Sequence, residues 1–258
     1  IHNGLKSAPE ADRLTLIRRA TFDLTGLPPT PEEVESFEKD IKPDAYKRLI
    51  ERVLKSQHYG EQLGRHWLDV VRYADSGGFA NDFERPNAWR YRDYVIQSFN
   101  SDKPYDQFLL EQIAGDLLPA TDQAQTHANL IATGFLALGP KPLNQGNKVL
   151  FKLDVVDEQI DVTTRAFLGL TVSCARCHDH KFDPIPTRDY YAMAGIFRST
   201  DALYGTVNGQ GNRQASDLHA IAGNEADRVE KTRKHDNSLY RLNGRLLLME
   251  EEMREYRE

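Results

Sequence analysis

The chain has 258 residues, a formal net charge of −6 and 28% charged residues, a balance that is ordinary for a globular protein in water. The small negative charge offers no basic surface for nucleic acid or for an anionic membrane. No hydrophobic run is long enough to cross a bilayer. We therefore expect neither a nucleic-acid-binding nor a membrane-spanning protein, and the length allows one large domain with a substantial core.

Helical periodicity begins near the start of the chain. Residues 10–22 carry apolar side chains at helical spacing, and the proline-rich run 24–31 ends that helix. Thr30 is a suitable N-cap for a second helix, with Pro31 at its first position and Glu33 placed to complete a capping box. The sequence therefore predicts two short helices joined by a turn.

The next part of the chain alternates helices with polar loops. Apolar residues recur at steps of three or four in four further segments, which we predict as helices: 44–54, 61–73, 88–99 and 104–117. Segments 75–87 and 139–147 are rich in Gly, Pro, Asn and Asp. We predict both as loops, because these residues favour turns over regular structure.

A longer helix is predicted ahead of the most informative motif. Its mostly apolar stripe leads directly into Cys174 and is formed by Leu153, Val156, Ile160, Thr164, Phe167 and Leu170. After the motif we expect an irregular loop and then a short helix through Phe197, with Thr187 as its cap.

Cys174 and Cys177 are the only cysteines, and with His178 they form a single C-A-R-C-H sequence. This spacing is typical of covalent haem attachment. Two thiols on one helical turn can add across the two vinyl groups of a porphyrin, and the adjacent imidazole then becomes the proximal ligand of the iron. Because such attachment is normally completed outside the cytoplasm, the motif also favours a periplasmic or cell-surface location.

Three other structures could use the same residues. A disulfide between Cys174 and Cys177 would close a very tight loop. A zinc site made by the two cysteines, His178 and His180 has suitable ligand types, although thiolate zinc sites usually take their second pair from a distant segment. A thioredoxin-like redox pair would follow a strand of a βαβ unit, whereas the preceding segment is predicted as helix.

The sixth ligand would decide whether the haem carries electrons or performs chemistry. His66 is our first candidate distal ligand, and its alternative is a hydrogen-bonded core histidine. His180 is a weaker candidate, because it lies too close to His178 in sequence to reach the opposite face of the same haem easily. The three methionines have no convincing placement for this role: Met193, Met249 and Met253.

Two rival hypotheses involve catalysis. A catalytic haem would place some of four residues near its distal face: Arg72, Tyr73, Arg90 and Tyr91. Paired carboxylates could instead serve glycoside hydrolysis or calcium binding, and two acidic groups are available: Asp75, Asp82 and Glu84 in a loop, and Asp154, Asp157, Glu158 and Asp161 in a helix. More often such groups form ion pairs, and Asp161 with Arg165 has the spacing of a helical pair.

The last part of the chain changes character. Between residues 225 and 258, apolar residues follow steps of three and four among many charged residues, as in a coiled-coil seam: Leu239, Leu242, Leu246, Met249, Met253 and Tyr256. A single helix of this kind needs a partner for its stripe. The partner is a second copy of the chain or a returning helix, unless the helix packs on the preceding domain.

Five sequence strings resemble one family. In order they are FDLTGLPPTPEEV (22–34), HWLDVVRYADS (66–76), RPNAWRYRDYVI (85–96), FLGLTVSCARCHDHKFDPI (167–185) and YYAMAGIF (190–197). They are similar to a domain of unknown function found in large exported planctomycete and verrucomicrobial proteins, often called planctomycete cytochrome-type proteins. The resemblance covers nearly all of residues 5–205. It implies a module of a longer chain, preceded by a cytochrome c domain and followed, after a helical spacer, by a second domain.

These observations predict a mainly α protein: an irregular multi-helix domain over residues 1–222, with long loops around a haem site, and a heptad helix over 223–258. Cys174 and Cys177 would hold covalent haem c, with His178 on the iron. We expect an exported redox or electron-transfer module whose partner is a redox protein or a neighbouring cytochrome domain. Since the chain opens at Ile1, any export signal would lie upstream. The alternatives are a zinc-stabilised scaffold module and a haem or carboxylate enzyme acting on polysaccharide-related substrates.

Overall fold

The computed structural model describes residues 8–78, 82–206, 212–219 and 221. The chain divides into two compact units, residues 1–217 and 218–258. The predicted heptad helix over 225–258 lies outside the described residues, together with Met249 and Met253. All helices named below belong to the first unit.

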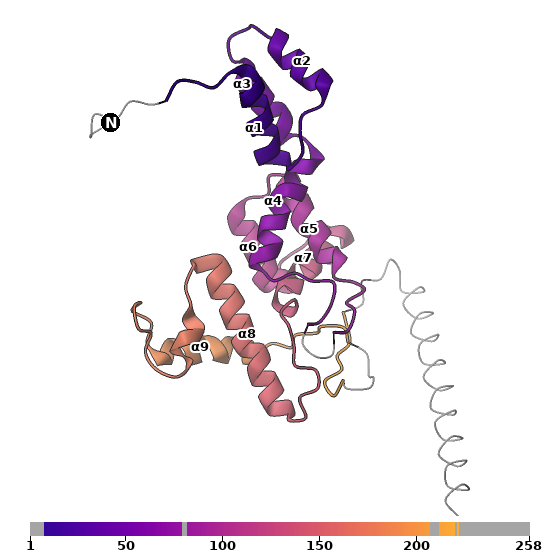
Figure 1. The fold of residues 1–258 in the computed structure, drawn as a ribbon. Coiled ribbons are helices and arrows are strands. Elements are labelled where there is room, and N and C mark those ends of the chain that lie inside the picture. Colours follow the sequence, from indigo (N-terminus) through magenta and orange to yellow (C-terminus); the bar gives the residue numbers. More distant parts are fainter. Residues whose placement is uncertain (1–7, 79–81, 207–211, 220, 222–258) are drawn as a thin grey trace, which may run out of the picture. The chain divides into compact units, whose positions relative to one another are not determined.

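The first unit is mainly helical, as predicted (Figure 1). Extended pairing in the described residues is limited to two isolated bridges, between Ser76 and Glu84 and between Thr206 and Ser216. The helices are α1 (Arg13–Thr25), α2 (Pro31–Lys39), α3 (Ala45–Leu54), α4 (Gln57–Val70), α5 (Trp89–Asn100), α6 (Tyr105–Ala114), η1 (Gly115–Leu117), α7 (Gln123–Ala132), η2 (Thr133–Ala137), α8 (Lys148–Leu168), η3 (Val172–Arg176) and α9 (Thr187–Arg198), where η marks a 3₁₀-helix.

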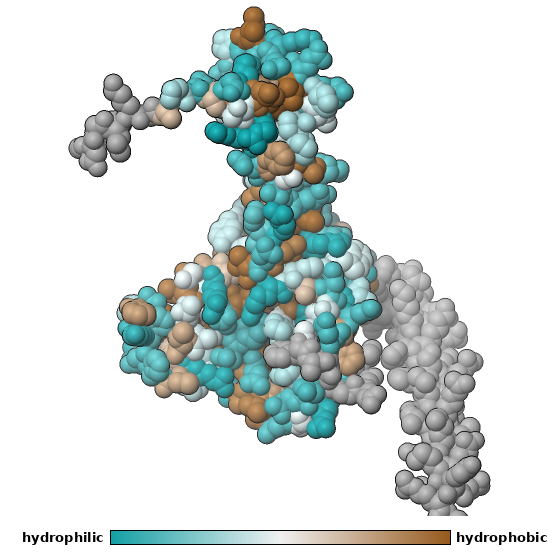
Figure 2. All heavy atoms as spheres, viewed as in Figure 1, coloured by the Kyte–Doolittle hydropathy of each residue, from teal (hydrophilic) through white to brown (hydrophobic). Residues whose placement is uncertain are grey.

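Helices α1, α2 and α3 share one hydrophobic cluster that includes Ile17, Phe37 and Leu49. The predicted capping box is confirmed: the Thr30 side chain accepts from the Glu33 backbone N–H, and the Glu33 carboxylate accepts from the Thr30 N–H. Hydrophobic residues also reach the surface over these helices (Figure 2). The three helices therefore have a local core of their own.

Helices α4 to α7 surround an aromatic core. The Trp67 ring meets Phe108 edge-on, with 5.0 Å between ring centroids, and stacks on Phe167 of α8 at 6.0 Å. The Trp67 indole N–H donates to the Tyr91 hydroxyl at 3.1 Å and to the Gln112 amide oxygen at 3.2 Å. Aromatic pairs of this kind add to the stability that burial provides. Aromatic side chains from α4, α5, α6 and α8 thus pack against one another in this core.

The bounds of α4 differ from the predicted 61–73, and one helix was not predicted. Helix α4 begins at Gln57, earlier than predicted, because Ser56 caps it by accepting from the His58 N–H. It ends at Val70, and Arg72 follows in left-handed backbone with φ of 57°. Helix α7 was not predicted, because its sequence QAQTHANLIA gives little amphipathic signal.

Helix α8 is the longest helix described, with 21 residues, and α9 and η3 pack against it (Figure 1). Asn147 caps its start by accepting from the Val149 and Leu150 N–H groups. The predicted loop over 139–147 is confirmed. In the part of the chain that the structure describes, no helix combines the length and the apolar character needed to cross a membrane.

Candidate functional site

The C-A-R-C-H motif begins on the short helix η3 and not on α8. Helix α8 ends at Leu168, and Gly169 then takes left-handed backbone with φ of 66° while its N–H donates to the Arg165 and Thr164 carbonyls. A glycine in this conformation terminates a helix. The prediction that the long helix leads directly into Cys174 is therefore wrong, and Cys174 lies on η3, with Cys177 as its C-cap.

Helix η3 separates its side chains into three rows. A 3₁₀-helix has three residues per turn, so residues three apart lie on the same side. Val172 and Ala175 form the inner row, with exposed fractions of 4% and 0%. Cys174 and Cys177 form the outer row, and both thiols are free and exposed. The helix thus places the two thiols together on the surface.

The third row, Ser173 and Arg176, is anchored on one acidic residue of α8. Arg176 Nη1 donates to Asp157 Oδ2 at 3.1 Å, and Ser173 Oγ contacts the Asp157 carbonyl at 3.4 Å. Tyr190 of α9 donates its hydroxyl to Asp157 Oδ1 at 2.6 Å. Burial and this hydrogen bond raise the pKa of Tyr190. Asp157 therefore joins η3, α8 and α9.

His178 has one ring nitrogen occupied and one available. Its Nδ1 lies 2.8 Å from the backbone carbonyl of Asp179. A carbonyl only accepts, so Nδ1 carries the proton and Nε2 of the neutral ring keeps its lone pair. The side chain is exposed. This is the tautomer and the kind of hydrogen bond found in metal-ligating histidines.

His180 is used differently in the described loop, and its role as a weaker candidate ligand stays a prediction. Its Nδ1 accepts from the N–H groups of Phe182 at 3.3 Å and Asp183 at 2.9 Å. Because Nδ1 accepts, the ring proton is on Nε2, which donates to Thr171 Oγ1 at 3.0 Å. The His180 side chain is 7% exposed. Both ring nitrogens therefore hold the loop after the motif in place.

The structure also bears on the other uses of the two cysteines. No disulfide joins them. Among the described residues, no three His, Cys, Asp or Glu side chains come together in a way that could hold a metal ion. The zinc arrangement of Cys174, Cys177, His178 and His180 is therefore not assembled, since His180 is engaged elsewhere.

His66 is exposed on α4, so it is not the buried core histidine of the alternative interpretation. Helix α4 packs against α1, α5 and α8, whereas η3 packs against α8 and α9. The described contacts do not bring His66 to the motif. Met193 is partly buried and packs on the cluster that contains Val172 and Ala175. The sixth ligand stays a prediction.

Exposed apolar side chains lie along the segments next to the motif. Leu168 at the end of α8 is 63% exposed, Phe182 in the following loop 83%, and Tyr191 on α9 58%. The Tyr191 hydroxyl donates to the Arg176 carbonyl at 3.2 Å, which places this ring beside η3. Single exposed apolar residues are common on protein surfaces, and only a contiguous patch marks a binding site.

The residues proposed for a catalytic haem have other contacts. Tyr91 is buried in the aromatic core, and Tyr73 donates to Asp75 at 2.6 Å. Arg90 donates to Asn87 at 3.3 Å. Arg72 pairs with Glu158. These contacts do not place the four residues beside the motif.

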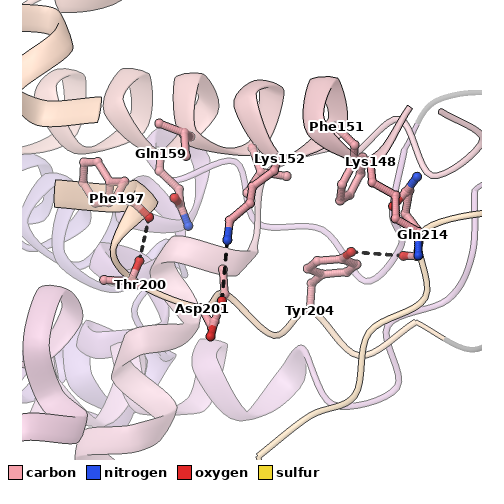
Figure 3. A pocket seen from close by; sticks show the side chains of 12 residues that line it. Lys148, Phe151, Lys152, Gln159, Phe197, Thr200, Asp201, Tyr204 and Gln214 are labelled. Atoms are coloured by element: carbon pink, nitrogen blue, oxygen red, sulfur yellow. Dashed lines mark hydrogen bonds and ion pairs between the residues drawn. The ribbon is translucent and has the colours of Figure 1, made fainter. Parts of the chain in front are cut away.

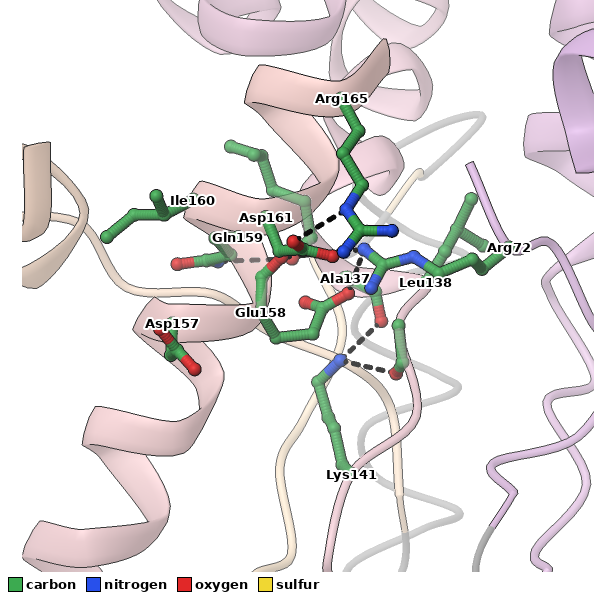
Figure 4. Close-up of polar contacts among 12 residues, drawn as sticks. Arg72, Ala137, Leu138, Lys141, Asp157, Glu158, Gln159, Ile160, Asp161 and Arg165 are labelled. Atoms are coloured by element: carbon green, nitrogen blue, oxygen red, sulfur yellow. Dashed lines mark hydrogen bonds and ion pairs between the residues drawn. The ribbon is translucent and has the colours of Figure 1, made fainter. Parts of the chain in front are cut away.

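The acidic residues of α8 do not form a single site (Figure 4). Asp161 pairs with Arg165 at 2.8 Å, as predicted from their spacing. Asp157 turns toward η3, and Glu158 enters a separate charged cluster. In the loop, Asp82 Oδ1 accepts from the Gly78 N–H at 2.8 Å. Among the described residues, no three acidic side chains come together in a way that could hold a calcium ion.

The charged cluster around Glu158 contains three cations from three segments: Arg72, Arg85 and Lys141. Arg72 forms an ion pair with the Glu158 carboxylate. Lys141 is 2% exposed, and its ammonium donates to the carbonyls of Ala137 at 2.7 Å and Gly139 at 3.0 Å. Burial lowers the pKa of Lys141 to about 8, against the opposing charge of Glu158.

A surface pocket of about 250 Å³ lies between α8 and the chain that follows α9 (Figure 3). Its walls include aromatic rings and two lysines: Phe151, Phe197, Tyr204, Lys148 and Lys152. Lys152 lies 3.8 Å from Asp201, and Tyr204 donates to the Gln214 carbonyl at 3.1 Å. The pocket contains no residue of the motif, and its mixed lining identifies no ligand class.

A family profile described as a protein of unknown function (DUF1549), with the name PSCyt2, matches residues 1–202. The match includes the whole C-A-R-C-H motif, α8 and α9. The name is consistent with the cytochrome-type resemblance of the sequence strings, and the description assigns no cofactor. No curated protein and no solved structure matches the chain significantly.

Proposed function

The chain belongs to the DUF1549 (PSCyt2) family of proteins of unknown function, and we propose that its first unit is an exported c-type haem domain that transfers electrons within a larger protein. The observation that carries the proposal is the outer row of η3. Cys174 and Cys177 share this row, both are exposed, and neither takes part in a hydrophobic cluster of the described residues.

The donor set fits covalent haem. Each thiol would add its S–H bond across one vinyl group, so that a C–S bond forms, the hydrogen goes to the neighbouring carbon and no oxidant is consumed. His178 Nε2 has the free lone pair with which this residue would hold the iron. The bound haem supplies one-electron chemistry through its iron.

The surface beside the motif supports the same proposal. Phe182 and Tyr191 expose large apolar areas next to the thiols in sequence or in space. A porphyrin covering these rings would remove them from water, at roughly 25 cal/mol per Å² of apolar surface. We propose export to the periplasm or the cell surface, because thioether attachment takes place there.

The test is covalent mass and optical spectroscopy on the full-length protein exported by its native host. We expect an added mass of one haem and a Soret band that survives denaturation. The Cys174→Ala/Cys177→Ala variant should lose both, whereas His178→Ala should keep part of the covalent haem with a changed spectrum. A native protein without added mass would contradict the proposal.

The sixth ligand is tested in the same preparation. If His66 is the distal ligand, His66→Ala should convert a six-coordinate low-spin spectrum to a five-coordinate one. His219→Ala is the matched control, because His219 is also exposed. A low-spin spectrum that survives His66→Ala would remove His66 from the proposal and leave haem attachment intact.

A further inference from the structure

Ser173 and Arg176 of η3 both contact Asp157 of α8. Arg176 pairs with its carboxylate, Ser173 contacts its backbone carbonyl, and Tyr190 donates to the second carboxylate oxygen. The Arg176 and Asp157 side chains are 40% and 29% exposed, so the pair is only partly shielded from water. The charge-assisted bond from Arg176 ties η3 to the Asp157 carboxylate, and the bond from Tyr190 of α9 holds that carboxylate in place.

The loop that follows the motif is closed by its own hydrogen bonds. Asp179 Oδ1 accepts from the Thr187 N–H at 2.8 Å and so caps α9, the role that the sequence assigned to Thr187 itself. The His180 N–H donates to the Ile185 carbonyl at 2.9 Å. His180 ties the same loop to Thr171, just before η3. Both ends of the motif are therefore anchored.

The cores of the first unit do not use the motif's reactive groups. The four hydrophobic clusters of the described residues contain neither of the cysteines nor His178. The inner row, Val172 and Ala175, already packs against Val156, Ile160 and Tyr190. These elements thus pack on one another without the two thiols or His178.

We infer that the attachment site is preformed in the folded chain, and that Asp157 is the positioning residue that turns both thiols outward before any cofactor arrives. The identity of the cofactor rests on the proposed function, whereas the preformed pair of thiols does not. Haem would therefore be added to a folded surface, in contrast to a cytochrome whose core forms around its haem.

The first experiment uses the full chain made in a host without haem attachment, with phenylarsine oxide as the probe, because its arsenic bridges two neighbouring thiols. We expect the wild type to bind phenylarsine oxide about tenfold more tightly than Asp157→Ala, as the loss of a charge-assisted anchor implies. Asp161→Ala, which removes the acidic partner of Arg165 on the same helix, should bind like the wild type.

Circular dichroism of each variant shows whether it folds. If Asp157→Ala does not fold, Tyr190→Phe removes one hydrogen bond to Asp157 and should weaken probe binding by a smaller factor, about threefold. Equal binding by the wild type and folded Asp157 or Tyr190 variants would overturn the positioning role. A wild-type chain that is unfolded without haem would overturn the preformed site.

The second experiment separates this inference from the proposed function. In the exporting host, Asp157→Ala should carry several-fold less covalent haem than Asp161→Ala at equal protein yield. Full haem loading of Asp157→Ala would refute the positioning role and leave the function standing. Probe binding as expected, with no haem on any variant, would refute the function and leave the preformed thiol pair standing.

Discussion

Asp157 and Glu158 are neighbours on α8, yet they belong to networks of different kinds. Asp157 is partly exposed, and hydrogen bonds reach both of its carboxylate oxygens. The Glu158 side chain is 12% exposed and has three cations around it, one of them the buried Lys141. One residue step along the helix changes the direction of the side chain by about 100°, and with it the surroundings of the carboxylate.

The two ion pairs differ in how much they contribute to the free energy of unfolding and in how they orient side chains. A partly exposed pair such as Asp157 with Arg176 contributes little free energy but fixes a direction. A buried pair is expensive to assemble, and removing one partner leaves uncompensated charge in the interior. Burial raises the pKa of Glu158, while the charges of Lys141, Arg72 and Arg85 act in the opposite direction. We therefore expect stability to depend on Glu158 and thiol geometry to depend on Asp157.

The largest effect is expected for Glu158→Gln. This change leaves Arg72 and Lys141 without their buried anion and should lower the free energy of unfolding by about 3 kcal/mol. Urea denaturation followed by circular dichroism measures the loss. Phenylarsine oxide binding by the folded fraction should stay at the wild-type level. A loss no greater than that of Asp157→Asn would contradict the contrast between the two networks.

A second effect concerns pH. The pKa of Lys141 falls from 10.5 to about 8 in the folded state, so its charge costs stability below pH 8. Between about pH 8 and 10 the cost is relieved, because only the unfolded chain still holds the proton. Lys141→Met should remove this rise, worth up to about 3 kcal/mol for a pKa that falls from 10.5 to about 8. Denaturation at several pH values tests it, and parallel pH profiles of the two proteins would speak against it.

The smallest effects are expected at the partly exposed pairs. Asp157→Asn should cost about 1 kcal/mol, because an amide keeps the Tyr190 hydrogen bond but loses the charge opposite Arg176. Asp161→Asn, which removes a helical pair with Arg165, should cost about 0.3 kcal/mol. Thermal unfolding of both variants measures the two losses of stability. Equal losses would mean that Asp157 has no role beyond that of an ordinary surface pair.

Local sequence signals predicted much of the fold. The capping box of Thr30 and Glu33, the Asp161–Arg165 pair and the loop over 139–147 are confirmed, because each depends on residues close together in the chain. The mainly α class is confirmed as well. The end of α8 was missed, although Gly169 is a recognisable stop signal, because the apolar stripe continues beyond it.

Long-range roles could not be obtained in this way. The sequence identified Asp157 only as one of four acidic residues on the same helix. Its partners Arg176 and Tyr190 come close to it only when η3 and α9 pack on α8. His180 has the chemistry of a ligand, and only the loop conformation shows that both ring nitrogens are occupied. Histidine and carboxylate side chains serve many purposes, so their roles follow from the groups that face them.

The three rows of side chains on η3 restrict how many residues can separate the two cysteines. One extra residue between Cys174 and Cys177 would advance the second thiol by about 120°, out of the outer row. Two extra residues would place the second thiol in the third row, with Ser173 and Arg176. Three extra residues would return it to the outer row, one turn further along the helix. The two-residue gap between the cysteines is therefore the shortest insert that keeps both sulfur atoms on one side of this helix.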